Sequence, residues 1–192
     1  MFDNLRRKMT ANEDRLRVFI SSRMTELADL RAIGRRELQR LGVKAFVYEA
    51  DTGALPDDPE TASLRELDRC DVLILVIGGS WGEITERKYD RAREINKPCL
   101  VYERLAENSN ADPELTRFLK KLSGPRGVPS RTTFRNAVDL AEKVAEDVQG
   151  WLVREYRRLS AAQLVADDSS RRASALASDS PFEQLTALMV RR

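Results

Sequence analysis

The sequence predicts an α/β protein with a doubly wound parallel sheet of about five strands and helices on both faces. Short apolar runs alternate with amphipathic helical stretches along the chain. The run from Val72 to Ile77 is wholly aliphatic and lies between Asp71 and Gly78-Gly79, as expected for a central strand that helices cover on both sides. Strands that alternate with helices are joined by right-handed crossovers, which build a parallel sheet.

Local patterns predict each element in turn. Strands are expected at residues 17–21, 44–48, 72–77, 99–102 and 132–134, and helices at residues 24–41, 58–67, 85–95, 112–124 and 138–156. Asp58-Pro59 and Asp112-Pro113 each combine a capping residue with a first-turn proline. The stripe expected to bury the first helix comprises Leu27, Leu30, Ile33, Leu38 and Leu41. This order of elements is typical of a flavodoxin-like fold.

The local composition of the chain suggests four segments. Residues 1–15 read as a polar leader, 16–160 as the α/β domain, 161–180 as a flexible linker rich in Ala and Ser, and 181–192 as a short amphipathic helix. The leader does not resemble a signal peptide, and no apolar run approaches the roughly 18 residues of a membrane span. We therefore expect a cytoplasmic protein with no membrane partner.

Composition excludes several kinds of chemistry. The 192-residue chain has a net charge of only +2, with acidic and basic residues interspersed, so no duplex nucleic acid is expected as a partner. It contains no histidine, which removes Ser-His-Asp and Cys-His mechanisms. Cys70 and Cys99 alone cannot form a zinc cluster and are expected to be buried. No metal site and no required cofactor are predicted.

The loops after the first three strands are the expected ligand site, because ligands of open parallel sheets bind beyond the carboxyl ends of the strands. These loops are residues 21–23, 49–56 and 78–83. The candidate ligand-binding residues are Ser21, Ser22, Arg23, Gly79, Ser80 and Trp81. Neither a GxxxxGK[ST] loop nor a GxGxxG turn occurs, so P-loop and Rossmann-type dinucleotide binding have no support.

Four stretches in this order resemble the TIR-like family filed as a domain of unknown function: VFISSRMTELADLR, YEADTGA, CDVLILVIGGSWG and ITERKYDRAREINKPCLVY. The resemblance covers about residues 16–160 and extends to TIR domains and nucleoside deoxyribosyltransferases. It implies a TIR-like sheet domain that recognises a nucleotide in signalling or defence. Some such proteins cleave the N-glycosidic bond of NAD or of nucleosides, whereas others only assemble signalling complexes.

The family resemblance places the catalytic glutamate of active relatives on Lys88. A lysine repels the positive charge that grows on the sugar as the glycosidic bond breaks. If Thr85 caps the helix, Lys88 also opposes the positive helix end, at a cost of about 0.3–1 kcal/mol. Glu86 or Glu83 has then taken over catalysis, or Lys88 and the helix amides bind a phosphate without hydrolysis, or Lys88 is a solvated residue.

Two classes of function follow, and the sequence does not decide between them. In the first, the chain is a nucleotide-recognition or signalling module whose catalytic position is occupied by Lys88. In the second, it is an N-glycosidase or transferase that acts on NAD or a nucleoside through Glu86 or Glu83. NAD or a related nucleotide is the expected ligand or substrate. Further expected partners are a second copy of the chain or further domains of a longer protein.

Overall fold

The computed structural model describes residues 15–23, 27–52, 56, 58–105, 112–123 and 131–178. Residues 1–14 of the predicted leader and the helix predicted at 181–192 lie outside these ranges. The chain divides into two compact units, Met1–Asp147 and Val148–Arg192. The first unit contains the whole sheet and is the one that positions the site.

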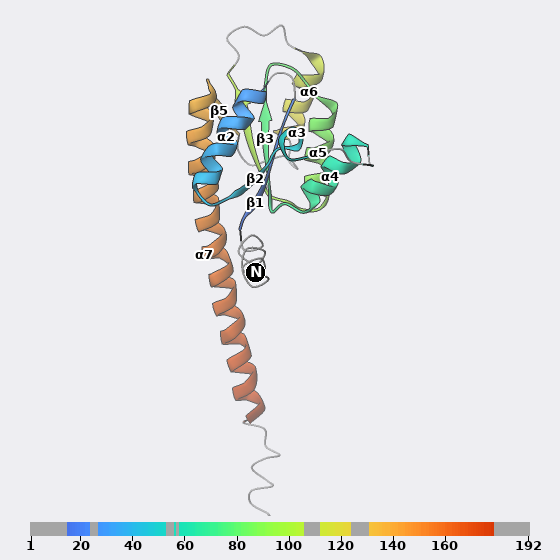
Figure 1. Ribbon diagram of the computed structural model, residues 1–192. Coiled ribbons are helices and arrows are strands. Elements are labelled where there is room, and N and C mark those ends of the chain that lie inside the picture. The colour runs from blue at the N-terminus through green and yellow to red at the C-terminus, as the bar shows by residue number, and fades with distance from the viewer. Residues whose placement is uncertain are drawn as a thin grey trace, which may run out of the picture. The chain divides into compact units, whose positions relative to one another are not determined.

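Five parallel strands form one sheet in the first unit (Figure 1). The strands are β1 (Arg17–Ser22), β2 (Lys44–Phe46), β3 (Val72–Ile77), β4 (Cys99–Arg104) and β5 (Thr132–Phe134). Their order is β2-β1-β3-β4-β5, which confirms the predicted flavodoxin-like fold class. The chain leaves β1 toward β2 on one side and later returns to β3 on the other. The switch point of the sheet therefore lies between the carboxyl ends of β1 and β3.

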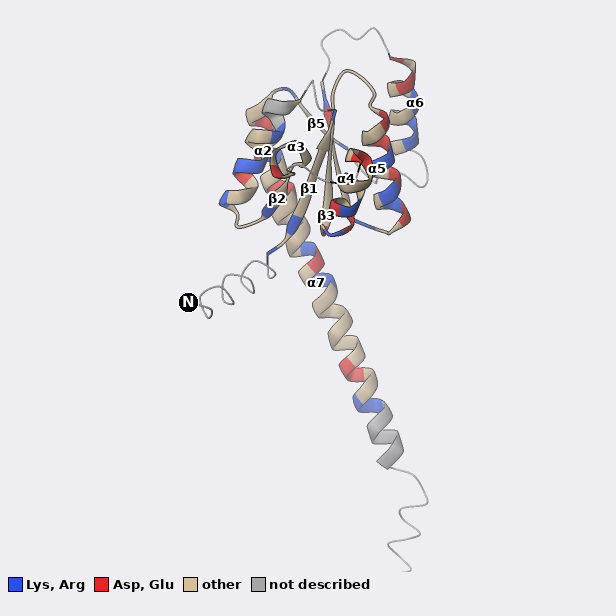
Figure 2. Cartoon of the chain, turned by 45° about the vertical axis from the view of Figure 1, so that its right-hand side comes forward, with Lys and Arg blue, Asp and Glu red and all other residues tan. Residues whose placement is uncertain are grey.

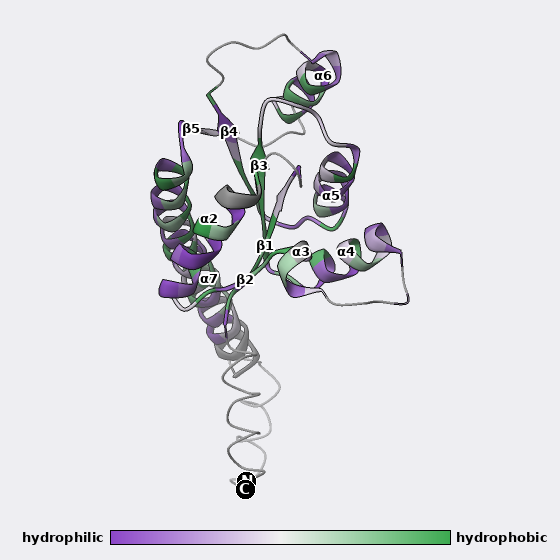
Figure 3. Cartoon of the chain, turned by 45° about the horizontal axis from the view of Figure 1, so that its top comes forward, coloured by the Kyte–Doolittle hydropathy of each residue, from purple (hydrophilic) through white to green (hydrophobic). Residues whose placement is uncertain are grey.

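Helices cover both faces of the sheet. They are α2 (Ala28–Arg40), α3 (Tyr48–Asp51), α4 (Pro59–Asp68), α5 (Glu83–Glu94), α6 (Pro113–Leu122) and α7 (Ala137–Ser178). Figures 1 and 3 show α4, α5 and α6 on one face, and α2 with the first turns of α7 on the other. Asp58 accepts a hydrogen bond from Thr61 N, and Asp112 accepts from Glu114 N. Both predicted helix starts are confirmed.

The core is centred on β3, all of whose residues are buried. Figure 3 shows β3 as a hydrophobic, green strand. Beneath α5 and α6, Tyr89 packs edge-on against Phe118 with ring centroids 5.8 Å apart. Beneath α4 and α5, Phe19 packs with Leu67 and Ala92. These contacts fix α5 on the sheet, and α5 carries all three candidate catalytic positions, Glu83, Glu86 and Lys88.

Helix α5 begins three residues earlier than predicted, counted from its cap. Its N-cap is Gly82, so Thr85 is the third helical residue and not the cap. Lys88 consequently lies in the second turn, and the proposed capping-box argument at Thr85 is wrong. A glycine cap has no side-chain signal to read, whereas Thr85 offers a plausible hydroxyl.

Two other local predictions are also wrong. Tyr48 opens helix α3 instead of ending β2, because Asp51 accepts from Val47 N and closes a turn. The predicted buried stripe of α2 is wrong at Leu41, which is 46% exposed, although Leu27 and Leu38 are buried as predicted. Arg31 is buried as well. Leu27, Arg31 and Leu38 share a face at helical spacing.

The described part of the second unit is helical throughout. Residues 161–178 continue α7, so the flexible linker predicted for 161–180 is wrong over this range. Ala, Leu, Gln and Arg are strong helix formers, and residues 151–178 contain neither glycine nor proline. Among the described helices, none is both long enough and apolar enough to cross a membrane.

We expect Leu75→Ala to lower the free energy of unfolding by about 2–5 kcal/mol, because the Leu75 side chain is fully buried in β3 and its removal leaves a cavity. Leu41→Ala is the matched control, since Leu41 is 46% exposed and its loss should cost less than about 0.5 kcal/mol. Urea unfolding followed by circular dichroism measures both. Equal losses for the two variants would contradict the packing described here.

Candidate functional site

A cavity of about 580 Å³ opens at the switch point of the sheet. It is lined by Ser22, Arg23, Trp81, Gly82, Glu83, Ile84, Thr85 and Lys88. Ser22 and Arg23 come from the carboxyl end of β1, and the other residues come from the loop after β3 and the start of α5. A cavity therefore lies within part of the predicted ligand region, and its volume is typical of small-molecule sites.

Lys88 lines this cavity although it is only 8% exposed. Its Nζ lies 5.2 Å from the centroid of the Phe19 ring and 5.8 Å from that of Tyr48. Aromatic faces attract a cation and repay part of the cost of removing it from water. Lys88, the position at which the family resemblance predicts a catalytic glutamate, is thus a buried ammonium group at the cavity wall.

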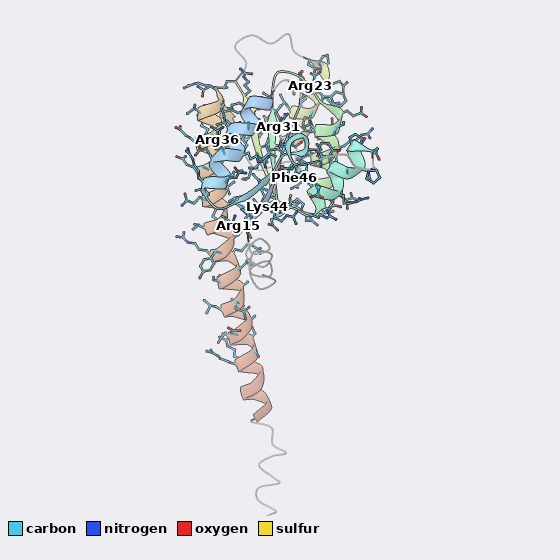
Figure 4. All side chains as sticks on the ribbon, viewed as in Figure 1. Arg15, Arg23, Arg31, Arg36, Lys44 and Phe46 are labelled. Carbon is cyan, nitrogen blue, oxygen red and sulfur yellow. The ribbon has the colours of Figure 1, made fainter. Side chains whose placement is uncertain are left out.

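A second buried cation, Arg31, organises the end of β1. Its Nη1 donates to Ser22 Oγ at 2.5 Å and to the carbonyl oxygen of Arg23 at 3.1 Å. Arg31 is 4% exposed, so the Ser22 hydroxyl is held by a desolvated guanidinium. Figure 4 labels Arg31 and Arg23 toward this end of the sheet. The Arg31 contacts place the Ser22 hydroxyl and the Arg23 backbone at the cavity.

The amino end of α5 forms another wall of the cavity. Gly82 caps the helix without a side chain, and the first-turn residues Glu83, Ile84 and Thr85 line the same space. First-turn N–H groups have no partner within their helix, and the helix dipole makes this end positive. A Cβ at Gly82 would lie 3.2 Å from Thr85 Oγ1, so glycine leaves room for close approach.

Glu86 lies on the side of α5 that faces α6. Two residues along a helix correspond to a rotation of about 200°, so Glu86 and Lys88 point in nearly opposite directions. Glu86 Oε2 accepts from Trp81 Nε1 at 2.7 Å and from Arg117 Nη2 at 2.5 Å, while Oε1 accepts from Lys121 Nζ at 2.9 Å. Glu86 is not among the residues that line the switch-point cavity.

We call these four residues, Trp81, Glu86, Arg117 and Lys121, the α5–α6 clamp. Burial alone would raise the pKa of Glu86, but hydrogen bonds from Arg117, Lys121 and Trp81 outweigh burial and lower the pKa to about 2. Arg117 also lies over the Trp81 ring, and Trp81 N donates to Asp112 at 2.9 Å. The clamp therefore fixes Trp81 at the edge of the cavity.

Not all of the predicted site residues gather at the cavity. Glu83 lines the cavity, but its exposed carboxylate forms a 2.6 Å salt bridge with Arg87. Exposed salt bridges of this kind contribute little to stability. Ser21 is buried outside the lining, and among the described residues its hydroxyl has no hydrogen-bond partner. Gly79 and Ser80 also lie outside the lining. Figure 2 shows acidic and basic residues interspersed on α5 and α6.

Sequence reasoning missed Arg31, Gly82 and the two clamp cations. Arg31 had a usable signal, because a charge between Leu27 and Leu38 on an apolar stripe is unusual. The clamp had none, since Arg117 and Lys121 lie 31 and 35 residues from Glu86 in the sequence.

Residues 17–149 match the family described as "Domain of unknown function (DUF4062)", and the chain belongs to this family. No curated protein matches the chain.

Three solved structures are similar to this chain. CMP N-glycosidase BcmB of Clostridium botulinum is 18% identical, with a TM-score of 0.47 over 67% of this chain and 96% of that one. A 2-deoxyribosyltransferase from Bacillus psychrosaccharolyticus is 13% identical, with a TM-score of 0.44 over 65% and 90%. A flavodoxin from the domain Archaea is 14% identical, with a TM-score of 0.37 over 70% and 99%.

Glu86→Gln should destabilise the protein at neutral pH by on the order of 2 kcal/mol, because the charge that holds Arg117 and Lys121 is lost. Since the pKa of Glu86 is lowered on folding from 4.5 to about 2, its contribution is complete above about 4.5 and disappears as the pH falls toward 2. Thermal unfolding of both proteins across this range measures the difference. A gap between them that stays constant down to pH of about 2 would contradict the clamp.

Proposed function

We propose that the switch-point cavity binds a nucleotide through its phosphate and does not cleave the glycosidic bond. The single observation that carries the proposal is Lys88, a buried ammonium group at the wall of this cavity. An ammonium attracts a phosphate and forms a charge-assisted hydrogen bond with it. It opposes the positively charged sugar of glycosidic cleavage.

Other cavity residues support the same ligand. Arg23 adds a second cation, and the first-turn amides of α5 add donors that favour an anion. The Trp81 side chain offers an aromatic surface of the kind on which a base can stack. A nucleotide such as NAD combines these features, namely phosphate charge and a planar base. A role as a signalling or defence sensor, which the family resemblance implies, is part of this proposal.

A second candidate function is N-glycosidic cleavage of NAD or a nucleoside with Glu83 as the reacting carboxylate. One observation favours it: Glu83 lines the cavity, and its partner Arg87 is exposed enough to release it. Glu86 is a weaker candidate, because three donors hold its carboxylate on the α6 side of the helix.

Lys88→Met should weaken the binding of NAD and AMP by about tenfold or more, since one charge-assisted hydrogen bond to the phosphate is lost. Adenosine, which has no phosphate, should be affected far less. Lys120→Met is the control, because Lys120 is an exposed lysine on α6. Isothermal titration calorimetry measures each affinity. Equal affinities of wild type and Lys88→Met for AMP would refute the phosphate role of Lys88.

The wild-type protein should leave NAD and nucleosides intact during prolonged incubation at high protein concentration, with nicotinamide and free base measured by chromatography. Product release by the wild type that is lost in Glu83→Gln would transfer the function to the second candidate. Release that survives Glu83→Gln but is lost in Glu86→Gln would place catalysis on Glu86, provided that this variant remains folded by circular dichroism.

A further inference from the structure

A second cavity, of about 590 Å³, lies beside the edge strand β2. Its lining residues are Arg15, Arg17, Arg35, Gln39, Val43, Lys44, Ala45, Phe46, Asp51 and Glu66. They come from the start of β1, from β2 and from α2, α3 and α4. We call this space the edge cavity. None of its residues was a predicted site residue, and none lines the switch-point cavity.

The edge cavity carries an excess of positive charge. Four of its lining residues are cationic, namely Arg15, Arg17, Arg35 and Lys44, and two are carboxylates, namely Asp51 and Glu66. Asp51 is already neutralised by Arg35 at 2.6 Å, and its other oxygen accepts from Val47 N. The Glu66 carboxylate forms a 2.5 Å salt bridge with Arg69, whereas its contact with the Arg17 guanidinium is long, at 3.7 Å.

Two of the cations are left without a carboxylate. Within the described part of the chain, Arg15 and Lys44 form no salt bridge, and both are exposed at the mouth of the cavity. Among the described residues, the Arg17 side chain has one carboxylate contact, with Glu66 at 3.7 Å. The charge available to a ligand is therefore positive, which favours an anion.

Backbone and ring groups complete the cavity. Lys44 N donates to Leu16 O across the sheet, so the next residue, Ala45, directs its N–H away from β1 toward the open edge. Gln39 adds a side-chain amide donor, and the half-buried Phe46 ring adds an apolar wall. One outward-facing residue in a three-residue strand is too little for an added peptide strand, so a small ligand fits better than a peptide.

The edge cavity is distinct from the switch-point cavity. Arg17 begins β1 and lines the edge cavity, whereas Ser22 ends β1 and lines the other. A strand of this length spans about 16 Å, at roughly 3.3 Å per residue. Figure 4 labels Arg15 and Lys44 at one end of the sheet and Arg23 at the opposite end.

We propose that the edge cavity is a second binding site, for a small phosphorylated anion with two or more negative charges. Arg15, Arg17 and Lys44 supply the charge, and Gln39 and the Ala45 N–H supply the directional donors. This site is independent of the nucleotide proposed for the switch-point cavity, because no residue is shared between the two.

The test uses inorganic pyrophosphate, which carries charge but no base, and amide NMR spectra of the full chain. The backbone amide of Ala45 and the side-chain amide of Gln39 report the edge cavity, and the amides of Gly82 and Thr85 report the switch-point cavity. We expect saturable shifts of Ala45 and Gln39 at low salt that weaken as ionic strength rises. The variant Arg15→Gln/Lys44→Gln should weaken this binding by about tenfold or more, while Lys88→Met should leave it unchanged.

Both substituted side chains are exposed, so the double variant should stay folded, and its spectrum shows directly whether it does. The proposal would be overturned if pyrophosphate caused no shifts at Ala45 and Gln39 in the wild type, or if it caused the same shifts in the double variant. Loss of these shifts in Lys88→Met would show that the apparent second site is an effect of the first. Shifts confined to Gly82 and Thr85 would support only the nucleotide site.

Discussion

The buried ammonium group of Lys88 is the constraint on which the account of the site depends. A charge that is almost fully removed from water must find compensation nearby. The rings of Phe19 and Tyr48 provide part of it, and Lys88 also lines the switch-point cavity. Because Phe19 belongs to β1 and Tyr48 opens α3, the same contacts join α5 to the sheet beside the switch point.

Helix α5 places a buried cation and a buried carboxylate on opposite sides of the same helix. Its Lys88 side supports a cationic cavity, and its Glu86 side supports the α5–α6 clamp, about 200° away around the helix. The Glu86 carboxylate accepts hydrogen bonds from Trp81, Arg117 and Lys121, and so it holds these three side chains in place. An acid or base for catalysis needs a pKa nearer the working pH than about 2. Lys88 and Glu86 thus have different physical roles, although both lie on α5.

The fold was predictable because its signals are local. The aliphatic run of β3 and the Asp-Pro starts of α4 and α6 each lie within a few residues. The start of α5 was missed because Gly82 caps it without a side chain. The predicted last helix ended too early because an Ala/Ser-rich composition is compatible with both a linker and a helix. The clamp depends on residues that only the crossover from β3 through β4 to α6 brings together. No local pattern encodes it.

The most direct test of phosphate binding by Lys88 is a crystal structure of the full chain grown with AMP. A phosphate oxygen should lie within about 3 Å of Lys88 Nζ and near the first-turn amides of α5, with the glycosidic bond intact. A nucleotide seated with its ribose against Lys88 and its phosphate in solvent would contradict the account. So would a cavity that stays empty while AMP is bound elsewhere.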